Sequence, residues 1–212
     1  MRSWLRLQRR ERGGSGSVRR VDPDLEQLDR WRAGDTAAGE ALFARYFDSL
    51  CGFFATKCHG DADDLVQKTL LACVRAKDQF RKQSSFRTYL FTVARNELYQ
   101  HLRKQRRDDE RLDFSITSVA DLVTTPGTRL ARDAERRQML AVLQSMPVEQ
   151  QTLLELHYWE GMDTAALAEV FEISEGAVRV RLHRARKELK ERLAPGADDA
   201  ELDRIARARG RS

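Results

Sequence analysis

Residues 163–193, DTAALAEVFEISEGAVRVRLHRARKELKERL, decide the fold of this 212-residue chain. Residues 164–171 have the apolar spacing of a short helix, with Asp163 as its candidate N-cap. Ser174 is placed to cap a second helix over residues 175–193, after a turn of only three residues. Two helices joined by so tight a turn form a helix-turn-helix unit, whose second helix lies in the major groove of DNA. The alternative is an ordinary helical hairpin with a basic face toward solvent.

The second of these helices separates into an inner and an outer face. Four apolar residues recur at helical spacing and are assigned to the core: Val178, Leu182, Ala185 and Leu189. The outer residues are candidates for contact with duplex DNA, because arginine can donate two hydrogen bonds to guanine O6 and N7. These candidates are Glu175, Gly176, Arg179, Val180, Arg181, His183, Arg184 and Lys187. Side chains nearer the flanks are expected at phosphate, namely Arg181, Arg186 and Lys190.

The turn between the two helices contains one departure from the common pattern. Its first position is commonly Gly in helix-turn-helix units, because the residue there tends to adopt a positive φ, and here it is Glu172. A non-glycine residue in that conformation costs on the order of 1 kcal/mol. The small Ala168, in contrast, suits the close crossing of the two helices. The departure weakens the prediction of the turn slightly without overturning it.

Charge is strongly patterned along the chain. In total 38 Lys and Arg oppose 33 Asp and Glu, which gives a formal net charge of +5. Residues 1–20 contain seven arginines and one glutamate, residues 92–107 carry a net charge of +4, residues 108–125 carry −4 and residues 174–192 carry +4. Two basic helical regions on either side of an acidic connector favour a polyanionic partner such as nucleic acid over solvated helix faces.

Composition and spacing exclude several classes of protein. No apolar run approaches the ~18 residues of a membrane span, so we expect no membrane insertion, and the N-terminus lacks the apolar segment of a secretory signal. Three cysteines without paired spacing favour the reducing cytoplasm. Cys58-His59 lacks a second pair of metal ligands, and Cys73 has a core-facing position. No Gly-rich phosphate loop occurs outside a linker. We therefore expect no metal, no cofactor and no enzymatic activity.

The spacing of apolar residues predicts an all-α chain of two small helical domains. The first has four helices, over residues 24–33, 36–58, 61–78 and 85–107, with Asp61 capping the third and Ser84 or Ser85 the fourth. The second contains a helix to residue 145, a helix from residue 147 to 159, and the helix-turn-helix. The chain thus divides into a disordered basic arm (1–21), an N-terminal domain (22–107), an acidic flexible linker (108–128), a helix-turn-helix domain (129–194) and a flexible tail (195–212).

Two longer blocks of sequence carry a family resemblance. The first contains DADDLVQKTL from Asp61 and SFRTYLFTVARNEL from Ser85, and the second contains MPVEQQ from Met146 and VRVRLHRARKEL from Val178. In this order they resemble regions 2 and 4 of bacterial RNA polymerase sigma factors of the sigma-70 family, extracytoplasmic-function (ECF) group. The resemblance implies a sigma factor that binds core RNA polymerase and directs promoter-specific initiation of transcription.

The resemblance also implies roles for residues of the first domain. Region 2 of such proteins binds the clamp of core polymerase, which implies contacts by Asp61, Asp64, Gln67 and Arg75. It also binds the melted −10 element, and recognition of a single strand needs aromatic walls for a base and cations for the backbone. The residues implied are Phe80, Ser85, Phe86, Tyr89, Arg95, Asn96 and Arg103. Phe86 and Tyr89 suit the core equally well, and Asn96 suits either a base edge or solvent.

Region 4 is implied to bind the −35 element of promoter DNA and the polymerase flap, and an anti-sigma factor is a further candidate partner.

Two residues depart from the family pattern: Lys68 stands where Glu is usual, and Val74 where Trp is common. The alternative function is a helix-turn-helix transcriptional regulator that does not engage polymerase. Residues 24–107 would then form a sensor or dimerisation domain. The DDLVQ block from Asp63, followed by the SFRTYL block from Ser85, argues against this alternative, because a plain dimerisation bundle would not require these blocks.

Overall fold

The computed structural model describes residues 22–58, 60–81, 83–105, 112–122 and 134–193. The predicted basic arm, the C-terminal tail, the outer parts of the linker and residues 129–133 lie outside the described residues. Within the described ranges every regular element is a helix, in agreement with the predicted all-α class. None of the described helices combines the length and apolar character that a membrane span requires.

The described part of the N-terminal domain contains four α-helices and one 3₁₀ turn. They are α1 (Pro23–Arg32), α2 (Thr36–Ala55), α3 (Ala62–Ala76), η2 (Lys77–Gln79) and α4 (Phe86–Gln105). Side-chain caps begin three of the α-helices: Asp22 caps α1, Asp35 caps α2, and Ser85 Oγ accepts a hydrogen bond from Thr88 N at 3.0 Å in α4. The last of these confirms the prediction of Ser85 as a cap.

Asp61 does not cap α3, contrary to the prediction, because its carboxylate turns toward α4. It makes no side-chain hydrogen bond to the first turn of α3. Instead Asp61 Oδ2 accepts from Gln105 Nε2 at 3.4 Å and lies 3.5 Å from His101 Nε2. Burial of the imidazole holds the pKa of His101 below its usual range, despite this nearby carboxylate. The carboxylate thereby connects the start of α3 to the end of α4.

The middle of the predicted linker is packed between the two domains. It contains the short helix α5 (Val119–Leu122), and the ring of Phe114 stacks on Tyr99 of α4 with centroids 4.3 Å apart. On its other side, Thr117 O accepts a hydrogen bond from Val148 N at 2.8 Å, and Phe114 O accepts one from Glu149 N at 3.0 Å. The expectation of a flexible linker therefore does not apply to residues 112–122.

Residues 134–193 of the C-terminal domain form four helices, of which the last two make up the helix-turn-helix. They are α6 (Ala134–Ser145), α7 (Val148–Tyr158), α8 (Thr164–Phe171) and α9 (Glu175–Leu193). Pro147 precedes the first residue of α7 as its N-cap rather than occupying the first helical position. Gly161, with a φ of 62°, turns the chain between α7 and α8.

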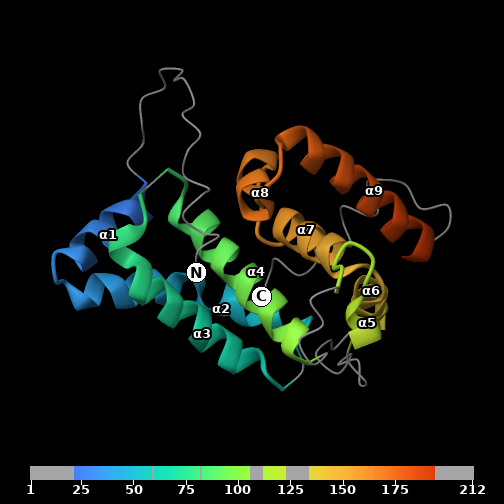
Figure 1. The fold of residues 1–212 in the computed structure, drawn as a ribbon, viewed down its shortest axis with the longest axis horizontal. Helices are drawn as coiled ribbons and strands as arrows, with labels where there is room; N and C mark the ends of the chain where they lie inside the picture. The colour runs from blue at the N-terminus through green and yellow to red at the C-terminus, as the bar shows by residue number, and fades with distance from the viewer. Residues whose placement is uncertain (1–21, 59, 82, 106–111, 123–133, 194–212) are drawn as a thin grey trace.

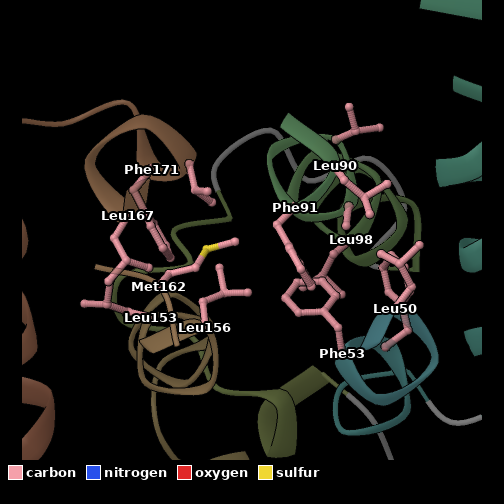
Figure 2. Packing of buried hydrophobic residues seen from close by; sticks show 14 of the residues in the cluster. Leu50, Phe53, Leu90, Phe91, Leu98, Leu153, Leu156, Met162, Leu167 and Phe171 are labelled. Carbon is pink, nitrogen blue, oxygen red and sulfur yellow. The ribbon is translucent and has the colours of Figure 1, made fainter. Parts of the chain in front are cut away.

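The two domains pack against each other, with α8 beside α4 (Figure 1). Buried apolar side chains of both domains belong to one continuous cluster. Figure 2 shows Phe91 of α4 facing Leu156 and Met162 of the C-terminal domain across the boundary. Burial of these apolar side chains stabilises the packing of one domain on the other. We call this arrangement the closed conformation, because the two domains share part of their core.

Candidate nucleic-acid interface

The helix-turn-helix has the local geometry that the sequence predicts. Asp163 Oδ1 accepts a hydrogen bond from Ala166 N at 2.8 Å, and Ser174 Oγ accepts one from Ala177 N at 3.2 Å, so both predicted caps are confirmed. Glu172 has φ 59° and ψ 36°, the left-handed conformation expected for this turn. The turn closes with a hydrogen bond from Ile173 N to Ala168 O at 3.0 Å.

Helix α9 presents a charged outer face to solvent. Its four predicted core residues, Val178, Leu182, Ala185 and Leu189, are buried, as expected. Gly176, Arg179, Val180, His183, Arg184 and Lys187 are exposed, and Glu175 and Arg181 are half-buried. Val180, an apolar residue, is 50% exposed at the centre of this charged face. The predicted outer face is therefore confirmed as a surface.

Several cations of α9 have acidic or aromatic partners within the same domain. Arg181 forms an ion pair with Glu149 of α7, which directs its guanidinium toward the neighbouring helix. Arg179 lies 3.6 Å from Glu175. The guanidinium of Arg186 is hydrogen-bonded to the hydroxyl of Tyr158 and lies over its ring. The cations of the outer face thus differ in how firmly the protein positions them.

The aromatic residues expected to flank a melted base lie in the core. Phe80, Phe86 and Tyr89 are buried, and the Phe80 and Tyr89 centroids are 4.7 Å apart. Burial also raises the pKa of the Tyr89 phenol above its usual range. This placement corrects the expectation that these three rings form walls of an open base pocket. Phe86 and Tyr89 follow the alternative interpretation as core residues, because helical spacing puts them on the inner face of α4.

The polar residues expected at the −10 strand differ in accessibility. Ser85 is exposed, although its hydroxyl caps α4, and Asn96 and Arg103 are half-buried. The Arg103 guanidinium lies 5.1 Å from the ring centroid of Phe114. Arg95 is buried against the C-terminal domain, where its Nη2 lies 3.3 Å from Glu172 Oε1. In this closed conformation Ser85, Asn96 and Arg103 are at least partly accessible to solvent, whereas Arg95 is buried.

The residues expected to contact polymerase follow one stripe of α3. Asp64, Gln67 and Arg75 are exposed, and Asp61 at the start of the helix is half-buried. Leu71 and Val74 lie on the same helical face and are also exposed. Leu71 was not predicted as a surface residue, although it lies one helical turn from Gln67 and from Arg75 on the polar side of α3.

The unusual Lys68 pairs with one of these residues. Its ammonium forms an ion pair with Asp64 one helical turn earlier, and hydrogen bonding to that carboxylate raises the pKa of Lys68. A glutamate at the same position would repel Asp64 instead. Lys68 therefore neutralises part of the negative charge on the exposed face of α3.

A pair of residues that the sequence does not reveal joins the two domains. Lys57 follows α2, and its ammonium forms a buried ion pair with Glu155 of α7. Thr56 Oγ1 lies 3.1 Å from the same carboxylate oxygen, and Thr56 O accepts a hydrogen bond from Gln144 Nε2 at 2.9 Å. No local sequence pattern distinguishes these residues from ordinary solvent-exposed ones.

Comparison with known proteins identifies both domains. Residues 42–108 match the model of sigma-70 region 2, and residues 136–189 match that of sigma-70 region 4. RNA polymerase sigma factor CarQ of Myxococcus xanthus is 30% identical over 171 residues, which cover 78% of this chain and 95% of the relative. ECF RNA polymerase sigma factor SigF of Caulobacter vibrioides is 34% identical over 164 residues, covering 76% and 88%. The chain belongs to the ECF group of sigma-70 factors. Its N-terminal domain is region 2 and its C-terminal domain is region 4.

Two solved structures have a related fold. The sigma factor RpoE of Bartonella quintana, crystallised with the anti-sigma factor NepR, matches with a TM-score of 0.59 and 25% identity, covering 74% of this chain and 98% of that one. CnrH in complex with the cytosolic domain of CnrY matches with a TM-score of 0.55 and 24% identity, covering 83% and 100%. Both relatives were solved bound to a second protein.

Proposed function

We propose that this sigma factor binds core RNA polymerase and directs initiation at promoters whose −35 duplex is contacted by α9 and whose melted −10 strand is contacted by α4. The observation that carries the proposal is the exposed, cationic outer face of α9 on an intact helix-turn-helix. In this role the chain supplies promoter specificity in the cytoplasm, and the polymerase supplies the catalysis.

Recognition of the −35 element rests on the exposed residues at the centre of α9. Arg179 and Arg184 are exposed, and an arginine guanidinium can donate paired hydrogen bonds to guanine in the major groove. The exposed methyl groups of Val180 are suited to contact with the C5-methyl of thymine. Arg181 pairs with Glu149, so we assign it to the adjacent phosphate backbone rather than to a base.

Recognition of the −10 element rests on the polar and cationic residues of α4. Asn96 can hydrogen-bond a base edge, and Arg103 can contact the strand backbone. Arg95 joins them only when the C-terminal domain moves away, because Glu172 now occupies its guanidinium. The buried aromatic rings support α4 from beneath rather than stacking on bases.

Binding of the polymerase clamp rests on α3. Its exposed stripe combines apolar side chains, Leu71 and Val74, with polar ones, Asp64, Gln67 and Arg75. A helix face of this kind suits docking against another helical surface, since the apolar residues gain by burial and the charges set the orientation. The polymerase flap is assigned to region 4.

Run-off transcription tests the proposal. Purified core polymerase is combined with a library of promoter fragments, including the one upstream of this protein's own gene, with and without the chain. We expect initiation from particular fragments only when the chain is present, and loss of that initiation when Leu71 is changed to Glu. Sequence-specific DNA binding without any polymerase-dependent initiation would instead identify a helix-turn-helix regulator.

A further inference from the structure

Arg181 and Arg186 lie on opposite flanks of α9. Five residues at 3.6 residues per turn separate their side chains by about 140° around the helix, on either side of the buried Leu182 and Ala185. A helix in the major groove turns its outermost side chains toward base edges and its flanks toward the two phosphate backbones that border the groove. The two arginines are therefore suited to contacts with one backbone each.

Helix α7 has a contact with each of these arginines. Glu149 in its first turn forms an ion pair with Arg181, and the hydroxyl of Tyr158, its last residue, accepts a hydrogen bond from Nε of Arg186. Both partners are half-buried, whereas Arg186 is exposed. A helix outside the helix-turn-helix thus holds a cation on each flank of the helix assigned to duplex DNA.

Tyr158 restrains Arg186 through two interactions. Besides the hydrogen bond to the hydroxyl, the guanidinium carbon lies 5.3 Å from the centroid of the Tyr158 ring, which is a cation–π contact. An exposed arginine without such contacts samples many rotamers and loses that freedom when it binds a phosphate. Because a guanidinium carries five N–H donors, a bond through Nε is compatible with a contact between its Nη groups and a phosphate.

The Tyr158 ring is itself well supported. The neighbouring His157 ring packs edge-on against it, with centroids 5.0 Å apart, and His157 Nδ1 lies 2.9 Å from Met162 O beyond the turn. At the other end of α7, the backbone amides of Val148 and Glu149 donate to carbonyls of residues 112–122. Both ends of α7 are therefore fixed, and Tyr158 offers Arg186 a rigid platform.

From these contacts we propose that Tyr158 is a positioning residue for DNA binding. Its ring and hydroxyl hold the Arg186 guanidinium toward the phosphate backbone at one edge of the major groove, and Arg181 serves the opposite edge. Tyr158 acts through Arg186 and not by touching DNA. The inference rests on the proposed function of α9 and extends it to a residue outside the helix-turn-helix. Because phosphate contacts do not depend on base sequence, the effect applies to any duplex.

A double-mutant cycle in the full-length chain tests the role of Tyr158. Tyr158→Phe removes the hydroxyl, keeps the ring and leaves the net charge unchanged, and it is made in the wild type and in Arg186→Ala. Tyr99→Phe is the matched control, because it removes the same atom from α4, and the buried Tyr99 hydroxyl has no hydrogen-bond partner among the described residues. Fluorescence anisotropy measures the Kd of a short labelled DNA duplex of mixed sequence over a range of NaCl concentrations.

We expect Tyr158→Phe to raise the Kd roughly threefold, because Arg186 must then be ordered at the moment of binding. In the Arg186→Ala background the same substitution should leave the Kd unchanged, since no guanidinium remains to be positioned. The slope of log K against log[NaCl] should decrease in magnitude by about 1 in Arg186→Ala and stay unchanged in Tyr158→Phe, in which the phosphate contact is still made. Tyr99→Phe should bind as the wild type does.

An equal rise of the Kd in both backgrounds would mean that Tyr158 only stabilises the domain, and it would overturn the inference. A Tyr158→Phe variant that binds as tightly as the wild type would overturn it as well. Lys187→Ala separates these outcomes from failure of the proposed function, because Lys187 is exposed on the outer face of α9. Weaker binding by Lys187→Ala but not by Arg186→Ala removes the inference alone. Unchanged binding in both, or no duplex binding by the wild type, removes the proposed DNA contact of α9 and the inference together.

Discussion

Lys57 and Glu155 are 98 residues apart in sequence and form an ion pair with both side chains buried. The pair is well satisfied: Lys57 Nζ also donates to Phe53 O at 2.8 Å, and Glu155 Oε1 accepts from Gln151 Nε2 at 2.8 Å. Two desolvated charges are tolerated in a core only when geometry and hydrogen bonds compensate for the lost water. The pair is thus one of the contacts that join region 2 to region 4.

Replacement of Glu155 by Ala is expected to lower the free energy of unfolding by about 3–5 kcal/mol, because it leaves the Lys57 ammonium buried without a counter-charge. Urea unfolding followed by circular dichroism measures the change. The double variant Lys57→Met/Glu155→Leu is the control and should recover most of the loss, since it removes both charges. A loss below about 1 kcal/mol in the single variant would contradict burial of the pair in solution.

Substitution of Gly39 by Ala is expected to destabilise the N-terminal domain. A Cβ at position 39 would lie 2.7 Å from Cδ1 and Nε1 of Trp31, so α1 could not keep its place on α2. Overpacking of this kind costs about 1–3 kcal/mol, which outweighs the helix propensity that alanine adds. Thermal unfolding measures the effect. Gly176→Ala is the matched control, because its Cβ would meet only Ser174 Oγ, at 3.9 Å, and should not lower the melting temperature.

Substitution of Arg184 by Ala is expected to weaken binding of duplex −35 DNA by about 1–3 kcal/mol and to relax the preference for one base pair, since a contact to a base edge is lost. Competition binding with oligonucleotides that differ at single positions measures both effects. Arg192→Ala serves as a comparison, because Arg192 binds Glu188 and the Ser145 carbonyl. An unchanged preference at every position would mean that the wrong face of α9 was assigned to DNA.

The three cysteines should differ in reactivity toward iodoacetamide. Burial raises the pKa of the Cys58 and Cys73 thiols to about 12, so at pH 8 roughly one molecule in ten thousand carries either thiolate. Cys51 is only half-buried, and its pKa is raised chiefly by partial burial. Mass spectrometry over time should show Cys51 modified first, with all three modified at similar rates in urea. Rapid native modification of Cys58 or Cys73 would disprove their burial.

Local signals account for what the sequence predicted correctly. Asp163 and Ser174 fix the ends of the helix-turn-helix because a cap acts within three residues of its own position. Asp61 shows where the same reasoning fails: its carboxylate has partners on α4, 40 or more residues away, and these outweigh the local amides. Phe86 shows a second limit, since helical spacing reveals an inner face and does not distinguish a core from a base pocket.

The contacts between the domains were beyond prediction from the sequence. The pairs Lys57–Glu155 and Arg95–Glu172 join residues 98 and 77 positions apart, and no periodicity relates them. One trace was present in the sequence, namely the glutamate at a turn position where glycine is common. The partner of this glutamate is Arg95, and the pair can be recognised only once the packing of α8 on α4 is known.

Residues 112–122, which contact both domains, have a consequence for competition between ligands. These residues hydrogen-bond to the start of α7 and stack on α4, and they also connect the two regions covalently. Region 4 therefore stays close to region 2. Short tethers produce effective concentrations in the millimolar range, on the order of those of abundant metabolites. Closure is also a unimolecular reaction, so its extent does not depend on how many copies of the chain a cell contains. Producing more of the protein would raise the number of open molecules in proportion, whereas a ligand that separates the domains would change the fraction itself.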